Sequence, residues 1–257
     1  GLQHQDGHSH VQAGLIPNCV TYDPTYGYEI AVIVREGLRR MYEENENVFF
    51  YLTLMNENYS HPAMPETKNI DDEIIKGIYQ LEQVPSKGKK KAIANVQLLG
   101  SGTILEKVRQ AAQILADDFN ISSDVYSVTS FNELARDGQD VTRWNMLHPE
   151  SKAKKPYISK VITKKAGPAI AATDYIKNYS DQVRAYIDTE YRVLGTDGFG
   201  RSDSRDNLRQ HFEVDQFYIV VAALYELAGR GDIESSVVSG AIKRFNINVS
   251  KLNPLYA

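Results

Sequence analysis

Apolar and polar positions in the first quarter of the chain indicate a helix followed by a strand. Asp23-Pro24 has the N-cap and first-turn residues typical of a helix start. Beyond it, apolar side chains return every three or four positions with charged residues between them, as on one face of an amphipathic helix. These apolar positions are Ile30, Val34, Leu38 and Met41. Residues 48–55 are then continuously apolar and rich in β-branched and aromatic side chains, which predicts a strand buried on both faces.

The stretch 56–72 is polar, includes Pro62 and Pro65, and shows no periodicity. Long stretches without regular structure are uncommon inside a compact domain. We therefore expect a boundary in this stretch and a second structural unit after it.

The second unit alternates between short apolar runs and helical patterns. The predicted strands lie at 78–81, 96–99, 125–128, 169–172 and 191–194. A basic loop, 87–91, separates the first two of them and is expected to form a hairpin or an excursion from the sheet. Strands joined by crossover helices are parallel. The pattern therefore predicts an α/β fold, with a mostly parallel sheet and helices on both of its faces.

Capping residues mark the helix boundaries of this unit. Gly100-Ser101-Gly102 turns the chain into a helix, where Thr103 and Glu106 match a capping box. Thr173 is the expected N-cap of a further helix. The last two predicted helices run from Asp215 to Gly229 and over 237–245.

Composition narrows the class of protein. With 257 residues, 42% of them hydrophobic, and a net charge of −4, we expect a soluble globular protein of about one to one and a half domains. Cys19 is the only cysteine, which excludes an internal disulfide and fits a reducing compartment, so we expect a cytoplasmic location. No apolar run reaches the roughly eighteen residues that a membrane span needs, and the acidic balance argues against broad nucleic-acid binding. The expected partners are small molecules or proteins.

Familiar catalytic motifs are absent, including the nucleophile elbow, the Walker loop, the dinucleotide fingerprint and the zinc-protease motif. The turn 100–103 could hold an anion on free backbone N–H groups, but every strand–helix connection of this kind needs a turn, which favours a structural role. In the loop 197–205, Arg201 and Arg205 could hold a carboxylate or phosphate. Alternatively, the arginines and aspartates of this loop pair with one another and cap the following helix.

The lysine cluster 87–91 and the histidine-rich first ten residues each allow more than one interpretation. The lysine cluster fits a solvated loop, with partner docking as the alternative. His4, His8 and His10 with Asp6 could be metal ligands or part of a frayed end. A third interpretation is that one of these histidines reaches an active site built mostly elsewhere, because imidazole changes charge near neutral pH.

Several longer blocks are more specific than any short motif. They are Gly1–His10, Ile16–Cys19, Leu54–Tyr59, Pro62–Pro65, Ser127–Gly138, Arg143–Pro149 and Leu194–Asp203. In content and order these blocks closely resemble the C-terminal part of the bacterial homodimeric pyruvate dehydrogenase family, the decarboxylating first component of the pyruvate dehydrogenase complex. The resemblance covers the whole chain, although the segment 87–95 is longer than the family pattern.

The resemblance implies two parts of a longer enzyme. Residues 1–65 would be the C-terminal end of the middle, pyrimidine-binding domain, comprising its last helix and strand, and residues 66–257 a transketolase-type C-terminal domain. The family's cofactor is thiamine diphosphate with magnesium, whose ligands we expect upstream of Gly1, with no cofactor or metal ligand in this segment. By the same resemblance, His4 matches the active-centre histidine that faces the thiazolium and the substrate-derived intermediate.

The activity implied by the resemblance is decarboxylation of pyruvate and transfer of the acetyl group to the lipoyl group of dihydrolipoamide acetyltransferase. His4 would hydrogen-bond the substrate-derived oxygen or help to move protons, with His8 and His10 as candidates for support. A second subunit of a homodimer is the other implied partner, and the chain alone would be an incomplete enzyme. The alternatives are another thiamine-dependent enzyme of the transketolase family and a non-catalytic dimerisation or docking module.

Overall fold

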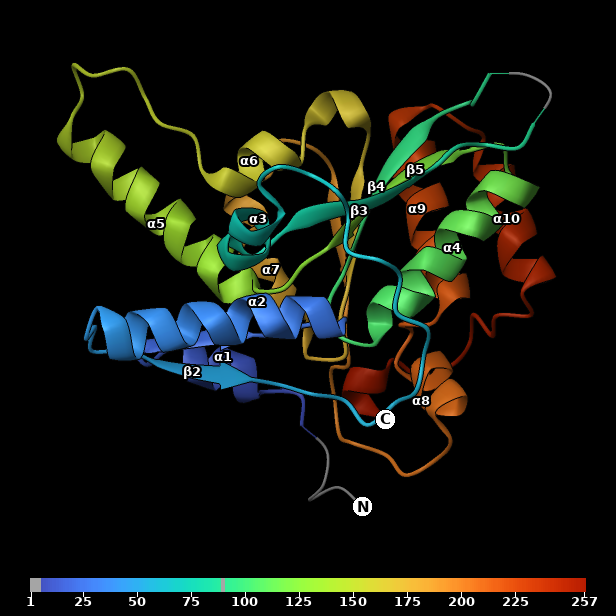
Figure 1. Ribbon diagram of the computed structural model, residues 1–257. Helices are drawn as coiled ribbons and strands as arrows, with labels where there is room; N and C mark the ends of the chain where they lie inside the picture. Colours follow the sequence, from blue (N-terminus) through green and yellow to red (C-terminus); the bar gives the residue numbers. More distant parts are fainter. Residues whose placement is uncertain (1–5, 89–90) are drawn as a thin grey trace.

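The protein forms two sheets, seen together in Figure 1. The structure is a computed structural model, and it describes residues 6–88 and 91–257. A small parallel sheet pairs β1 (Cys19–Tyr22) with β2 (Phe49–Leu52). A five-stranded sheet has the strand order β3-β5-β4-β6-β7. Its strands are β3 (Tyr79–Val84), β4 (Asn95–Gly100), β5 (Ser122–Ser127), β6 (Ala169–Ala172) and β7 (Tyr191–Leu194).

The N-terminal unit carries the predicted helix and strand, with different bounds. Its elements are α1 (Ser9–Gly14), β1, α2 (Gly27–Leu38), the π-helical turn η2 (Arg39–Glu43) and β2. The helix starts at Gly27 and not at Asp23-Pro24, because Glu29 on its first turn accepts the N–H groups of Thr25 and Tyr26. The prediction that the strand would be buried on both faces was wrong: all four residues of β2 are partly or largely exposed, and β1 is its one described neighbour.

The large sheet confirms the predicted mostly parallel arrangement. Every neighbouring pair of strands is parallel except β3 and β5, which are antiparallel. Because β5 lies between β3 and β4, the segment that joins β3 to β4 is an excursion and not a hairpin turn. All five predicted strands are present in this sheet.

Helices cover both faces of the large sheet, as predicted (Figure 1). One face packs against α4 (Ile104–Asp118), α9 (Gln216–Arg230) and α10 (Ser235–Arg244), and the other against α5 (Phe131–Leu147), α6 (Tyr157–Val161) and α7 (Lys177–Asp181). Neighbouring residues of a strand point to opposite faces, so Leu98 joins the first core and Leu99 the second. None of the helices within the described residues has the length and apolar character needed to cross a membrane.

The helix start predicted at Thr103 was correct, since Thr103 occupies the N-cap position of α4, but the predicted capping box and the helix start predicted at Thr173 were wrong. Thr103 directly precedes α4 but accepts no capping hydrogen bond, and the Glu106 carboxylate accepts the Tyr26 hydroxyl at 2.7 Å. Thr173 does not begin a helix, because its hydroxyl lies 3.1 Å from that of Ser101. The first N–H of α7, on Lys177, instead donates to the Asp197 carboxylate at 2.9 Å.

The prediction for α9 was correct at its start and wrong at its end. Asp215 caps α9 by accepting the N–H groups of Phe217 and Tyr218 at 3.0 and 2.9 Å. The helix continues past Gly229 and ends at Gly231, whose φ of +80° suits a glycine C-cap. The last predicted helix is confirmed as α10.

Buried carboxylates join the two units. Glu29 on α2 is fully buried and accepts the hydroxyl groups of Ser127 on β5 and Tyr79 on β3 at 2.6 and 2.7 Å. Burial raises the pKa of Glu29, and these hydrogen bonds oppose the rise by favouring the ionised form. An ion needs such partners when it leaves water, so the contact fixes how α2 lies against the large sheet.

Candidate functional site

A cleft of about 680 Å³ opens where several strands end. It is lined by residues that follow β2, β4, β6 and β7, by the start of the described chain, and by α8 (Arg205–His211). Its lining includes Asp6, His8, Thr53, Glu57, Asp174 and Arg209. Ligands of open α/β sheets bind at the carboxyl ends of the strands, so this cleft is the candidate site.

The N-terminal segment enters this cleft in a fixed conformation. The Asp6 carboxylate accepts the N–H groups of His8 and Ser9 at 3.1 and 3.0 Å, which caps the start of α1. The backbone oxygen of Gly7 accepts the N–H of Ile176 at 3.0 Å. His4 lies outside the described residues, and Asp6, which is two residues further along, lines the cleft.

The two described histidines of this segment have different surroundings. His8 is exposed and lines the cleft, whereas His10 is fully buried in α1. The His10 ring stacks on Tyr179 with 4.7 Å between ring centroids and meets Tyr175 edge-on at the same distance. Burial lowers the pKa of His10 to about 4, so its imidazole is neutral near pH 7. No cluster of three or more potential metal ligands exists within residues 6–88 and 91–257, so these do not support a metal site.

His10 is the end of a chain of hydrogen bonds. Its Nε2 lies 2.8 Å from the Thr53 hydroxyl, which in turn donates to the Asp23 carboxylate at 2.7 Å. Asp23 is fully buried, and burial raises its pKa to about 7, against the opposing effect of hydrogen bonds from Thr53 and Ser101. These hydrogen bonds connect α1, the end of β2 and the loop after β1, and Thr53 in the middle is partly exposed and lines the cleft.

The turn 100–103 holds a side chain of the protein itself. A Cβ on Gly102 would lie 2.8 and 2.9 Å from the two carboxylate oxygens of Asp23, and the φ of Gly102 is +51°. The Gly102 N–H donates to the backbone oxygen of Asp23 at 3.2 Å, and the Thr25 hydroxyl donates to the Gly102 oxygen at 2.8 Å. Within the described structure, the turn is a contact between the two units, which agrees with the structural role favoured above.

The loop 197–205 shows the predicted capping and an unpredicted pairing. Ser204 caps α8 by accepting the N–H of Asn207, and the Asp203 carboxylate accepts from the Asn207 side chain at 2.8 Å. Arg205 does not pair with the aspartates of the loop: it donates to the Asn56 side chain at 2.8 Å and lies 3.7 Å from Glu57. Arg201 is exposed and within electrostatic range of His211.

A partly buried ion pair that the sequence did not reveal closes one side of the cleft. Arg209 on α8 donates to the Glu57 carboxylate with both terminal nitrogens, one of them at 3.0 Å, and to the Thr103 hydroxyl at 3.3 Å. Burial raises the pKa of Asp174, and the nearby Arg209 opposes that rise. Because Glu57 and Arg209 are far apart in the chain, no local pattern could have paired them.

The basic loop extends from the far end of the sheet. Lys87 is exposed and lies 2.8 Å from Asp117 on α4, and Lys91 is exposed. Lys89 and Lys90 lie outside the described residues. The contacts of Lys87 fit the solvated-loop interpretation, and partner docking stays a prediction.

The ion pair yields a prediction about stability. Arg209→Met would leave the Glu57 carboxylate without its buried partner, and we expect the free energy of unfolding of the chain to fall by about 1–3 kcal/mol. Arg205→Met is the matched control, because its side chain is 53% exposed and such pairs contribute only about 0–1 kcal/mol. Urea unfolding measures the stability of both variants. Equal losses of stability would show that the burial of Arg209 does not strengthen its contribution.

The raised pKa of Asp23 yields a prediction about pH. The ordinary pKa of an aspartate is 3.8, and the pKa of Asp23 in the folded chain is about 7. Between these two pH values, Asp23 keeps its proton in the folded chain and releases it in the unfolded chain. The resulting stabilisation of the folded chain is complete below the unfolded pKa of Asp23 and is lost as the pH rises through its folded pKa. Asp23→Asn has no such loss, so its stability relative to the unchanged chain should increase across this window by up to about 1.4 kcal/mol per pH unit.

Urea midpoints of the two chains, measured at several pH values within that window, provide the check. The lowered pKa of His10 acts with the opposite sign, but it is present in both chains and cancels in the difference. A difference that does not change with pH would mean that Asp23 is ionised throughout the window.

Two family models cover most of the chain. Residues 1–62 match the pyruvate dehydrogenase E1 component middle domain. Residues 77–215 match the transketolase-like TK C-terminal domain. The first match contains the small sheet, and the second contains the whole of the large sheet.

Similar proteins agree with these matches. The chain is 60% identical over 260 aligned positions to the pyruvate dehydrogenase E1 component of Escherichia coli K12, covering 100% of this chain and 28% of that protein. It is 57% identical to the protein of the same name from Pseudomonas aeruginosa, covering 99% of this chain and 28% of the relative. The chain therefore spans 28% of the length of these curated relatives.

Solved structures show the same fold. Transketolase from Leishmania mexicana matches with a TM-score of 0.59 at 17% identity, covering 92% of this chain and 30% of that one. A transketolase mutant from Pichia stipitis matches with a TM-score of 0.57 at 14% identity, and the match covers 90% of this chain and 28% of that one. The chain belongs to the family of proteins with a transketolase-like C-terminal domain, and within it corresponds to the C-terminal portion of the bacterial pyruvate dehydrogenase E1 component.

Proposed function

We propose that this chain is the C-terminal part of a thiamine-diphosphate-dependent enzyme that decarboxylates pyruvate and passes the acetyl group to the lipoyl group of dihydrolipoamide acetyltransferase. The observation that carries the proposal is 60% identity along the whole chain to a protein named pyruvate dehydrogenase E1 component. The likeness to transketolases is below 20% identity and concerns the fold alone. The proposal extends to a homodimer in the cytoplasm.

The arginines among the described residues of the cleft already have partners in this chain. Thiamine diphosphate, when bound, supplies the carbon nucleophile that attacks the keto group of pyruvate. Holding its diphosphate and magnesium needs cationic groups or a cluster of carboxylates. Arg205 and Arg209 in the cleft are already bonded to Asn56 and Glu57. From the similarity to the pyruvate dehydrogenase E1 component, we propose that the ligands of the cofactor and of magnesium lie upstream of Gly1.

His4 is the residue of this chain that we assign to the chemistry. His4 lies three positions before Gly7, which lines the cleft. We propose that its imidazole hydrogen-bonds the oxygen derived from the substrate or carries a proton during acetyl transfer. Asp6 and Gly7 support this role, because their hydrogen bonds fix the direction in which the chain approaches the cleft.

Replacing this histidine tests its role. In the complete enzyme, we expect His4→Ala to lower the rate of acetyl transfer by about 10²–10⁴-fold, the usual effect of losing a positioned acid or base. His148→Ala is the control, since that exposed histidine stacks on Trp144 at the outer end of α5. The measurement is reductive acetylation of a lipoyl domain with pyruvate. Unchanged kinetics of His4→Ala would remove the residue from the mechanism.

Calorimetry with the isolated chain tests the placement of the cofactor ligands. We expect no micromolar binding of thiamine diphosphate with magnesium to the 257-residue chain, because the cleft arginines are already paired. Binding with that affinity would contradict the placement upstream of Gly1. Assays of the complete protein with pyruvate and other 2-oxoacids separate the proposal from a related thiamine-dependent activity.

A further inference from the structure

The segment that follows His4 is held by residues that lie much later in the chain. The side-chain amide of Asn132 donates one hydrogen to the backbone oxygen of His10 at 2.8 Å. Its second hydrogen goes to the Thr21 hydroxyl on β1 at 2.6 Å. Both donors of this amide are therefore used to tie α1 and β1 to the start of α5.

The orientation of the Asn132 amide is itself fixed. Its oxygen accepts the side-chain N–H of Gln182 at 2.7 Å, and Gln182 also donates to the backbone oxygen of Tyr179 at 2.7 Å. Asn132 is 3% exposed, so water does not compete for these bonds. Ser130 caps α5 two residues earlier by accepting the N–H of Glu133 at 3.0 Å, which anchors the helix that carries the amide.

The end of α1 fits closely against the same amide. A Cβ placed on Gly14 would lie 3.0 Å from the Asn132 nitrogen, so a larger residue there would push α1 away. On the other side of the segment, the Tyr179 ring stacks on His10. The contacts of Asn132 and its neighbours thus determine where α1 begins, and with it the path of the residues before α1.

We propose that Asn132 is a positioning residue for the reaction: it holds α1, and with it the residues Asp6–His8 that line the cleft, in one place. The inference rests on the proposed function. Reacting groups must be held to a fraction of an ångström, and a displacement of about 1 Å can lower a rate by about 10²-fold. The side-chain hydrogen bonds of Asn132 go to His10, Thr21 and Gln182, which do not line the cleft, so we expect its effect on the chemistry to pass through the N-terminal segment that carries His4.

Kinetics of the complete enzyme test this role. We expect Asn132→Ala to lower kcat for acetyl transfer by about 10–100-fold with little change in the KM for pyruvate. Gln182→Leu should act in the same direction with a smaller loss, because it keeps both donors of Asn132 and removes the bond that orients them, together with the hydrogen bond from Gln182 to Tyr179. Asn145→Ala is the matched control: this asparagine lies on the same helix and bonds to the oxygen of Lys154, far from α1.

A double-mutant cycle with His4→Ala distinguishes positioning from a general loss of stability. If Asn132 acts through His4, Asn132→Ala adds almost nothing in the His4→Ala enzyme, since the group that it positions is absent. An equal loss in both backgrounds, or an unchanged kcat for Asn132→Ala, overturns the inference. If circular dichroism shows that Asn132→Ala does not fold, the same double-mutant cycle with Gln182→Leu tests whether Asn132 acts through His4.

The kinetic results that would contradict the proposed role of His4 differ from those that would contradict only the role of Asn132. If His4→Ala keeps the full rate while Asn132→Ala lowers it, His4 leaves the proposed mechanism and Asn132 cannot act through it. If His4→Ala lowers the rate but shows no coupling to Asn132→Ala, the proposed function stands and only the inference is lost.

Discussion

Parallel strands end at the same edge of their sheet, and the candidate site depends on this constraint. The connections after β4, β6 and β7 leave the large sheet at one edge, where they meet the segment that leaves β2. Residues that are distant in sequence, such as Thr53, Asp174 and Arg209, therefore line one cleft. The ends of the chain follow the same geometry: Figure 1 shows the C-terminus and α8 on the side of the molecule where the N-terminal segment also lies.

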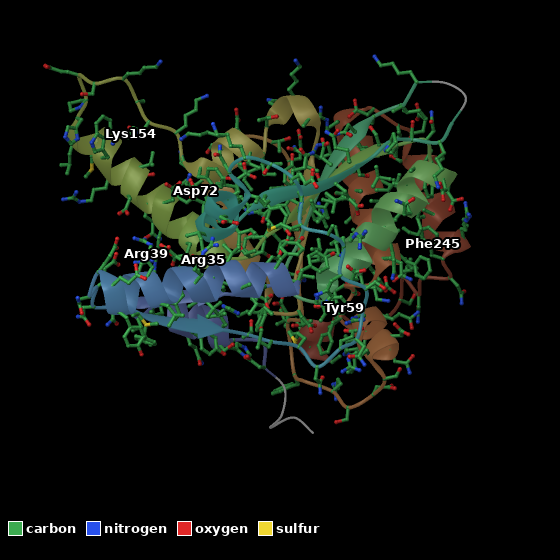
Figure 2. All side chains as sticks on the ribbon, viewed as in Figure 1. Arg35, Arg39, Tyr59, Asp72, Lys154 and Phe245 are labelled. Carbon is green, nitrogen blue, oxygen red and sulfur yellow. The ribbon has the colours of Figure 1, made fainter. Side chains whose placement is uncertain are left out.

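Polar contacts act together with a buried apolar cluster shared by the two units, and help to determine how the units sit against each other. Glu29 accepts hydroxyls from the large sheet, Asp23 fills the turn after β4, and Glu57 binds Arg209 on α8. Figure 2 shows Tyr59 on the segment after β2, and its hydroxyl donates to Thr25 at 2.5 Å. A hydrogen bond weakens when its direction changes, whereas apolar contacts tolerate sliding. Such a contact favours one relative placement of the units.

The sequence predicted the large sheet well because its strands are short apolar runs between glycine and polar residues. It missed β1, since Cys19–Tyr22 is only four residues long and contains a threonine. It also missed α5: residues such as Phe131 and Leu134 face the core, but the outer half of this helix is largely exposed and its apolar spacing fades. At that outer end, Lys154 lies 3.9 Å from the Trp144 ring, away from the body of the molecule (Figure 2).

The candidate site was less predictable than the fold, because it depends on contacts between distant residues. The sequence grouped His8 with His10, yet the two lie two positions apart at the start of α1, where the first lines the cleft and the second is buried in the core. It offered Arg205 as an anion ligand without showing that Asn56 already accepts its hydrogen bond. Capping residues next to a helix, such as Asp215, were predictable because both partners lie within one turn.

The antiparallel edge strand β3 affects the order in which the large sheet can assemble. β3 precedes β4 in the chain, but it pairs with β5, which is made only after β4 and α4. During synthesis, β3 must therefore wait unpaired until β5 has left the ribosome, while β4, α4 and β5 form contacts that are local in sequence. An unpaired strand is open to wrong partners, so this interval is when the chain is most exposed to misassembly.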